Sequence, residues 1–154
     1  MAVDYRRITN QQTNVALQGK AVWFDLVTED VDAAIDFYRD AFGWSFEVRQ
    51  NDVYAVATNN GQPVAAIAAF EEGDPNKGDA VWLTSISIGD VDAVTQSDVR
   101  EGGEVVDGPE TLAGRGRYIV VRDPQGALVM LLNAQGGDPA DGDIPDNSWL
   151  WSEL

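Results

Sequence analysis

Asp30-Val31-Asp32-Ala33 recurs later in the chain as Asp90-Val91-Asp92-Ala93. A β-rich run that contains tryptophan precedes each copy, Trp23–Val27 in the first case and Trp82–Ile88 in the second. A stretch with helical character follows each copy and ends at glycine. Four identical residues alone carry little information, but the repeated order of strand, cap, helix and glycine predicts an internal duplication.

Each half of the duplication is predicted to be a βαβββ module. Asp30 has the character of an N-cap, and Gly43 that of the residue that ends a helix. Apolar residues between them follow the period of one helix face: Ala34, Phe37, Tyr38, Ala41 and Phe42. Strands are expected over residues 21–27, 45–49, 53–58 and 63–70 in the first module. In the second module we expect strands over 81–88, 104–106, 117–122 and 127–132, and a helix over 91–101.

Composition shifts divide the chain further. Residues 1–19 are expected to form an N-terminal arm, and residues 20–134 a single domain with module one at 20–70 and module two at 80–133. Residues 135–154 are expected to form a linker and a C-terminal strand. That strand, within Trp149–Leu154, repeats the pattern of Trp23–Leu26, so it could instead begin a truncated module or pair with a partner.

The charge of the chain limits its partners. With 26 acidic and 10 basic residues the net charge is −16, which disfavours nucleic acid and anionic membranes and favours a cationic small molecule. A saline habitat is an alternative source of this acidity. There is no cysteine, no apolar run of about 20 residues and no secretory signal pattern, so a cytoplasmic protein without disulfides is expected.

Ten residues at the helix and the last hairpin carry a family resemblance. Together with the paired modules they resemble the vicinal oxygen chelate superfamily, which contains glyoxalases, bleomycin resistance proteins and extradiol dioxygenases; the ten are Asp30, Ala34, Phe37, Tyr38, Phe42, Gly43, Trp44, Asp123, Pro124 and Gly126. The resemblance covers residues 20–133. It implies an α+β fold in which paired βαβββ modules form a curved mixed sheet around a cleft, and it implies a homodimer.

The same resemblance implies where metal ligands would stand. Those positions are Trp23, then Leu83 or Thr84, then Met130, and one position within residues 65–69. None of these side chains is a usual ligand, and the chain has no histidine. We therefore expect no metal ion and no cofactor, and the sequence argues against metal-dependent glyoxalase or dioxygenase activity.

The candidate ligand-binding residues follow from these positions and from nearby polar groups. Apolar side chains in place of ligands predict either a hydrophobic cleft with aromatic walls or a cleft that has collapsed into core. Asp25 is a candidate acid, base or cation anchor, or a structural carboxylate at a sheet rim. The full set is Trp23, Asp25, Tyr54, Leu83, Thr84, Arg117, Tyr118 and Met130.

The leading functional hypothesis is a metal-free protein that binds, and so sequesters, a cationic or aromatic small molecule. A second hypothesis is a metal-independent lyase or isomerase that uses Asp25 as acid or base, with Tyr54 or Tyr118. A third is a structural or regulatory module of a tandem protein.

Overall fold

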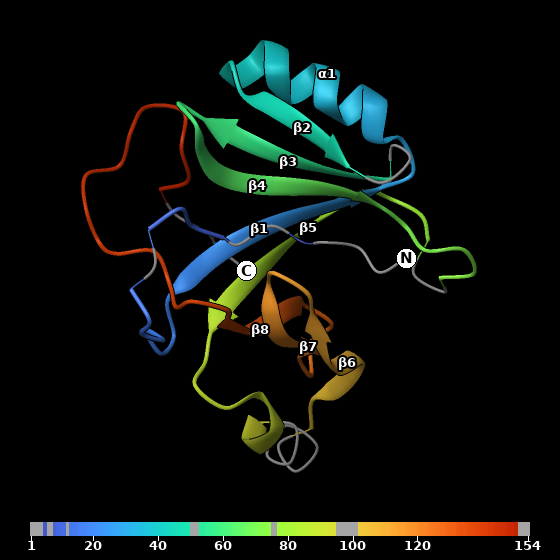
Figure 1. The fold of residues 1–154 in the computed structure, drawn as a ribbon. Coiled ribbons are helices and arrows are strands. Elements are labelled where there is room, and N and C mark those ends of the chain that lie inside the picture. The colour runs from blue at the N-terminus through green and yellow to red at the C-terminus, as the bar shows by residue number, and fades with distance from the viewer. Residues whose placement is uncertain are drawn as a thin grey trace. The chain divides into compact units, whose positions relative to one another are not determined.

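The computed structural model describes residues 5, 8–11, 13–49, 53–74, 77–94 and 102–150. One helix and eight strands have defined bounds (Figure 1): β1 Ala21–Thr28, α1 Val31–Phe42, β2 Ser45–Arg49, β3 Tyr54–Asn59, β4 Gln62–Ala69, β5 Val81–Ser87, β6 Glu104–Leu112, β7 Gly116–Arg122 and β8 Leu128–Ala134. The α+β class is confirmed. In the described part of the chain, no helix is both long and apolar enough to cross a membrane.

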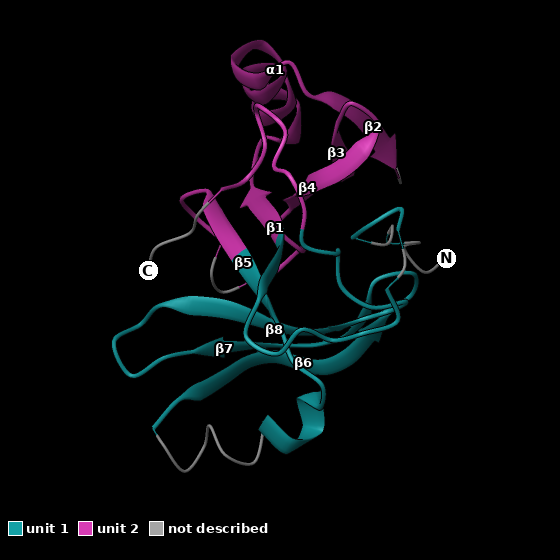
Figure 2. Ribbon diagram, turned by 90° about the vertical axis from the view of Figure 1, so that its left-hand side faces the viewer, with its two compact units in different colours: residues 1–23, 84–141, 152–154 teal, residues 24–83, 142–151 magenta. Residues whose placement is uncertain are grey.

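The chain forms two compact units, coloured separately in Figure 2. The first-module unit contains residues 24–83 and 142–151, and the second-module unit contains residues 1–23, 84–141 and 152–154. Both units therefore combine a module with a segment from beyond the predicted module boundaries. The C-terminal segment joins module one, and the N-terminal arm joins module two.

The first-module unit contains the strand order β2-β3-β4-β1. β2, β3 and β4 are antiparallel neighbours, whereas β4 and β1 run parallel, with Asp25 opposite Ala66. α1 packs against the sheet, and its core consists of Leu26, Val31, Ile35, Ala55 and Ile67. Small residues on β3 and β4, such as Ala57 and Ala65, leave room for a second cluster around Phe24 and Trp44.

α1 begins and ends as the sequence predicts. The Asp30 carboxylate accepts a hydrogen bond from the Ala33 amide at 2.9 Å, and Gly43 ends the helix in the left-handed conformation with φ of 69°. The predicted apolar face is only partly right. Ala34 and Tyr38 pack against the core, whereas Phe37 is 62% exposed and Phe42 is 41% exposed. The buried residues of the helix are Val31 and Ile35, which were not part of the predicted face. The apolar surface of α1 is thus wider than the core that it covers.

The second-module unit contains the strand order β5-β8-β7-β6. β5 and β8 are parallel, with Ser85 opposite Met130, and β8, β7 and β6 are antiparallel. Asp90 accepts from the Ala93 amide at 3.1 Å, so the second copy of the repeat caps in the same way as the first. Residues 91–94 are helical, and the rest of the predicted helix lies outside the described residues. β6 is longer than predicted, because pairing with β7 continues past Gly108-Pro109 through two register shifts.

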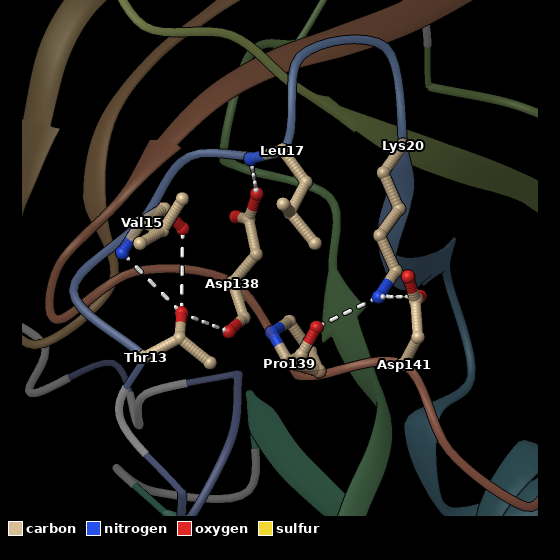
Figure 3. Close-up of polar contacts among 7 residues, drawn as sticks. All are labelled: Thr13, Val15, Leu17, Lys20, Asp138, Pro139 and Asp141. Carbon is tan, nitrogen blue, oxygen red and sulfur yellow. Dashed lines mark hydrogen bonds and ion pairs between the residues drawn. The ribbon is translucent and has the colours of Figure 1, made fainter.

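The N-terminal arm is tied to the segment after β8 (Figure 3). Asp138 is fully buried; its carboxylate accepts from the Leu17 amide, and its carbonyl accepts from Thr13 Oγ1 at 2.7 Å. Lys20 Nζ donates to the Pro139 carbonyl and pairs with Asp141, both at 2.7 Å. The segment predicted as a plain linker therefore contributes a buried carboxylate that holds the arm.

Candidate functional site

An aromatic pocket of about 470 Å³ lies within the first-module unit. Side chains of α1, of the short link between α1 and β2, of β5 and of the C-terminal segment surround it: Phe37, Tyr38, Phe42, Trp44, Trp82, Asn147, Ser148 and Trp149. None of these residues carries a charge. The volume is in the range of small-molecule sites, and an aromatic lining is typical of them.

The rings of the pocket contact one another at distances and angles that fix their positions. Trp82 meets Tyr38 edge to face at 5.4 Å and Trp149 edge to face at 5.0 Å between centroids. Tyr38 and Trp44 lie nearly parallel, 5.9 Å apart. Each such pair contributes about 0.5–1.5 kcal/mol beyond its buried area. The walls are therefore ordered by their own contacts.

Three residues of the C-terminal segment form one wall, and hydrogen bonds from the module hold them. Asn59 Nδ2 donates to the Asp146 carbonyl at 2.7 Å and to Ser148 Oγ at 3.0 Å. Trp44 Nε1 donates to the Asn147 carbonyl at 2.7 Å. Because Trp149 follows directly, these bonds place its ring at the pocket.

None of the eight residues predicted from the sequence lines this pocket. Five of them are buried in the units to which they belong: Trp23, Tyr54, Leu83, Tyr118 and Met130. Asp25, Thr84 and Arg117 are partly exposed. Within the second-module unit, the strand register brings Met130 opposite Val120 and places Tyr118 opposite Leu132, so these side chains share a sheet face. A role for the predicted set in binding stays a prediction.

Trp23 has a specific partner in the second-module unit. The guanidinium carbon of Arg115 lies 4.5 Å from the centroid of the Trp23 ring, a cation–π arrangement. Both side chains are buried, with exposures of 2% for Arg115 and 1% for Trp23. Arg115, which stands between two glycines in the sequence, is thus held in the core.

The polar residues on β7 have local acidic partners. Arg117 forms two hydrogen bonds with Asp92, at 2.6 and 3.0 Å, and this bonding lowers the pKa of the Asp92 carboxyl. Tyr118 donates to Asp107 at 2.6 Å. Burial raises the pKa of the Tyr118 phenol well above its ordinary value, and the Asp107 carboxylate raises it further. Tyr118 therefore keeps its proton at neutral pH, so it could donate a hydrogen bond but could not act as a base.

The residues at the metal-ligand positions of the resemblance do not fit a metal ion. Tryptophan, leucine, methionine and alanine side chains offer no suitable donor there, and Thr84 offers a neutral hydroxyl. Within the described residues, no three His, Cys, Asp or Glu side chains come together in a group that could hold a metal.

The aromatic pocket was missed because its residues were interpreted as core or strand residues. Phe37 and Phe42 match the helix period, and Trp82 matches a strand pattern, so nothing in the local pattern distinguishes them from core. Trp149 comes from a segment whose partner cannot be read from sequence. One feature of the sequence could have pointed to the pocket, which is an excess of aromatic residues at the end of the helix. Four of them stand within eight positions: Phe37, Tyr38, Phe42 and Trp44.

Comparison with solved structures reveals the same fold in several enzymes. The Mn(II)-bound glyoxalase from Novosphingobium aromaticivorans matches 85% of this chain and 44% of its own, with a TM-score of 0.58 and 19% identity. Methylmalonyl-CoA epimerase from Streptomyces coelicolor matches 80% of this chain and 99% of its own, with a TM-score of 0.53 and 20% identity. At these identities the likeness establishes fold alone.

Comparison of sequences gives nearer relatives. A Mycobacterium tuberculosis protein named "Putative glyoxylase CFP32" is 37% identical over 141 residues, 89% of this chain and 54% of the relative. The anthracycline biosynthesis protein DnrV of Streptomyces peucetius is 34% identical over 123 residues, 71% of this chain and 45% of the relative. This chain thus spans about half the length of these curated relatives. The family model described as Glyoxalase/Bleomycin resistance protein/Dioxygenase superfamily matches residues 20–131, and the chain belongs to that superfamily.

Proposed function

We propose that this chain binds a planar aromatic small molecule in the aromatic pocket, without a metal ion. The observation that supports this most directly is the lining itself, six aromatic side chains around about 470 Å³ with no charged group among them. Aromatic walls favour flat apolar ligands through stacking and edge contacts. A pocket of this volume accommodates a ligand of several fused rings.

The charge and the residue content of the chain support the same proposal. The net charge of −16 attracts a ligand that carries a positive group outside the rings. The sequence has no histidine, and the positions where the resemblance places metal ligands carry Trp23, Leu83 or Thr84, and Met130.

The names of two relatives point toward the same ligand class. The relatives from Streptomyces peucetius and Streptomyces sp. are both named as anthracycline biosynthesis proteins. Anthracyclines are planar polycyclic aromatic compounds, which is the ligand shape that the pocket favours. Those relatives are about twice as long as the part that aligns with this chain. The proposal therefore concerns the ligand of the pocket and does not extend to the activity of the relatives.

Calorimetric titration with planar aromatic amines, in the presence of a strong chelator, tests the proposal. We expect saturable binding at one site that the chelator leaves unchanged. Phe42→Ala removes an exposed wall of the pocket and should weaken binding about tenfold, in line with the burial that a phenyl ring provides. Val48→Ala is the matched control, because Val48 has a similar exposure of 46% and does not line the pocket.

Two results would contradict the proposal. One is loss of binding on addition of chelator, which would show that a metal ion is needed. The other is equal weakening by Phe42→Ala and Val48→Ala, which would show that the ligand binds elsewhere.

A further inference from the structure

The polar groups of the aromatic pocket differ in what they can still offer a ligand. Tyr38 Oη accepts a hydrogen bond from Trp82 Nε1 at 3.0 Å. An indole N–H can only donate, so the phenol oxygen is the acceptor in this pair. The phenol proton of Tyr38 is not used in that bond and can be donated to a ligand.

The Ser148 hydroxyl, like that of Tyr38, keeps a proton that it can donate to a ligand. Its Oγ accepts from Asn59 Nδ2 at 3.0 Å. The orientation of the Asn59 amide is fixed by its other partners, because the Asp146 and Asn147 carbonyl oxygens can only accept. The Ser148 hydroxyl is therefore an acceptor toward Asn59, and its own proton can be donated.

The main-chain acceptor at the pocket is already engaged. The Asn147 carbonyl accepts from Trp44 Nε1 at 2.7 Å and from Asn59 Nδ2 at 3.3 Å. A carbonyl oxygen has two lone pairs, so these two donors use its capacity. A ligand that offers a hydrogen-bond donor would have to compete with Trp44 or Asn59 for this oxygen.

Trp149 contributes its ring to the pocket and no donor. Its Nε1 is buried and has almost no accessible surface. A ligand in the pocket therefore meets the ring of Trp149 and not its N–H.

Taking the proposed function as the starting point, we propose that the pocket selects planar aromatic ligands that carry hydrogen-bond acceptor oxygens, such as the carbonyl groups of a quinone or an aromatic ketone. Tyr38 Oη and Ser148 Oγ are the donors available to those oxygens. The rings of the pocket bind the aromatic body, and the donors distinguish an oxygenated ligand from a plain hydrocarbon of the same shape.

A matched pair of probes tests this selectivity. One probe is anthraquinone and the other is anthracene, each carrying the same aminomethyl group at the same ring position for solubility. Calorimetry should give an affinity about 3- to 30-fold higher for the quinone, which corresponds to one or two net hydrogen bonds.

Tyr38→Phe removes the phenol O–H and keeps an aromatic ring in the wall. We expect the quinone-to-anthracene ratio to fall by about 3- to 10-fold in this variant, while the affinity for anthracene changes less. Leu150→Ala is the control, since Leu150 is 77% exposed and lies outside the pocket lining. The quinone-to-anthracene affinity ratio of Leu150→Ala should equal that of the unmodified protein.

The outcomes separate the two proposals. If both probes bind equally well and Tyr38→Phe leaves their affinity ratio unchanged, the acceptor selectivity is wrong while the aromatic site stands. Tighter binding of anthracene would overturn the selectivity as well. If neither probe binds, the proposed function itself fails.

Discussion

The Trp149 ring lies face to face with Phe24, with centroids 4.0 Å apart and planes inclined by 15°. Phe24 is on β1, at the start of the first module, and Trp149 comes 125 positions later in the chain. The stack therefore closes a long loop within one unit, and it covers a core side chain that would otherwise meet solvent. It also sets the position of one wall of the aromatic pocket.

Replacing Trp149 with alanine should lower the free energy of unfolding by about 2–3 kcal/mol. The ring is partly exposed, so the cost is below that of a fully buried tryptophan. Trp149→Phe keeps a stacked ring and should cost about 1 kcal/mol. Urea denaturation followed by circular dichroism measures both values; equal stability of the alanine variant and the unmodified protein would show that the stack contributes nothing.

The duplicated aspartates predict equal effects in the two compact units. Asp30→Ala and Asp90→Ala each leave a first-turn amide without its acceptor, and each should lower stability by about 1 kcal/mol. Asparagine caps a helix as well as aspartate, so Asp30→Asn and Asp90→Asn are the matched controls. Thermal unfolding of the four variants makes the comparison. An alanine variant that is as stable as its asparagine counterpart would refute the cap at that site.

The buried Asp138 carboxylate should be more important for stability than its exposed neighbour. Asp138→Ala leaves the Leu17 amide without an acceptor, at a cost of about 1–3 kcal/mol. Asp141→Ala removes a surface ion pair with Lys20 and should cost less than about 1 kcal/mol. Chemical denaturation gives the two energies, and hydrogen exchange at the Leu17 amide should accelerate only in Asp138→Ala. The reverse order of energies would contradict the arrangement in Figure 3.

The ion pair on β7 makes a prediction about pH. Hydrogen bonds from Arg117 lower the pKa of Asp92 in the folded state. A lowered carboxyl pKa adds stability above the unfolded value of about 3.9, and this contribution is lost as the pH falls through the folded value. Titration of the Asp92 carboxyl carbon by NMR should show the low pKa, and Arg117→Met should raise it.

Arg122→Met provides the control for that titration. Arg122 pairs with Glu104 at 3.4 Å, and the lowered pKa of Asp92 comes from Arg117, so this variant should leave the pKa of Asp92 unchanged. An unchanged pKa in Arg117→Met would show that another group is responsible.

The fold could be predicted from the sequence because its signals are local. Asp30, Gly43 and the Asp123–Gly126 turn act within a few residues of themselves, and β2 matches its predicted bounds at both ends. The site could not be predicted in the same way. Whether Phe37 is core or pocket depends on how much surface the sheet beneath it covers, and the place of Trp149 depends on hydrogen bonds from Asn59, which is remote in the chain.

The same distinction between local and remote signals applies to Arg115 and Arg117. The sequence Gly114-Arg115-Gly116-Arg117 looks like a mobile pair of cations. A Cβ on Gly116 would lie 2.1 Å from the Asn133 carbonyl, so this backbone is tightly packed, and Arg115 is buried beside it. Such a close approach depends on the pairing of β7 with β8 and leaves no trace in the composition.

Three of the five tryptophans in the chain, Trp44, Trp82 and Trp149, line one pocket, and Trp149 lies within 6.4 Å of the other two. Indole transitions this close together couple electronically, and the angles between their planes, 45° and 73°, give the coupling a handedness. The protein should therefore show an exciton couplet in its circular dichroism that belongs to the pocket and not to the backbone. A molecule that enters the pocket changes this signal directly, so the chain carries its own optical reporter of occupancy.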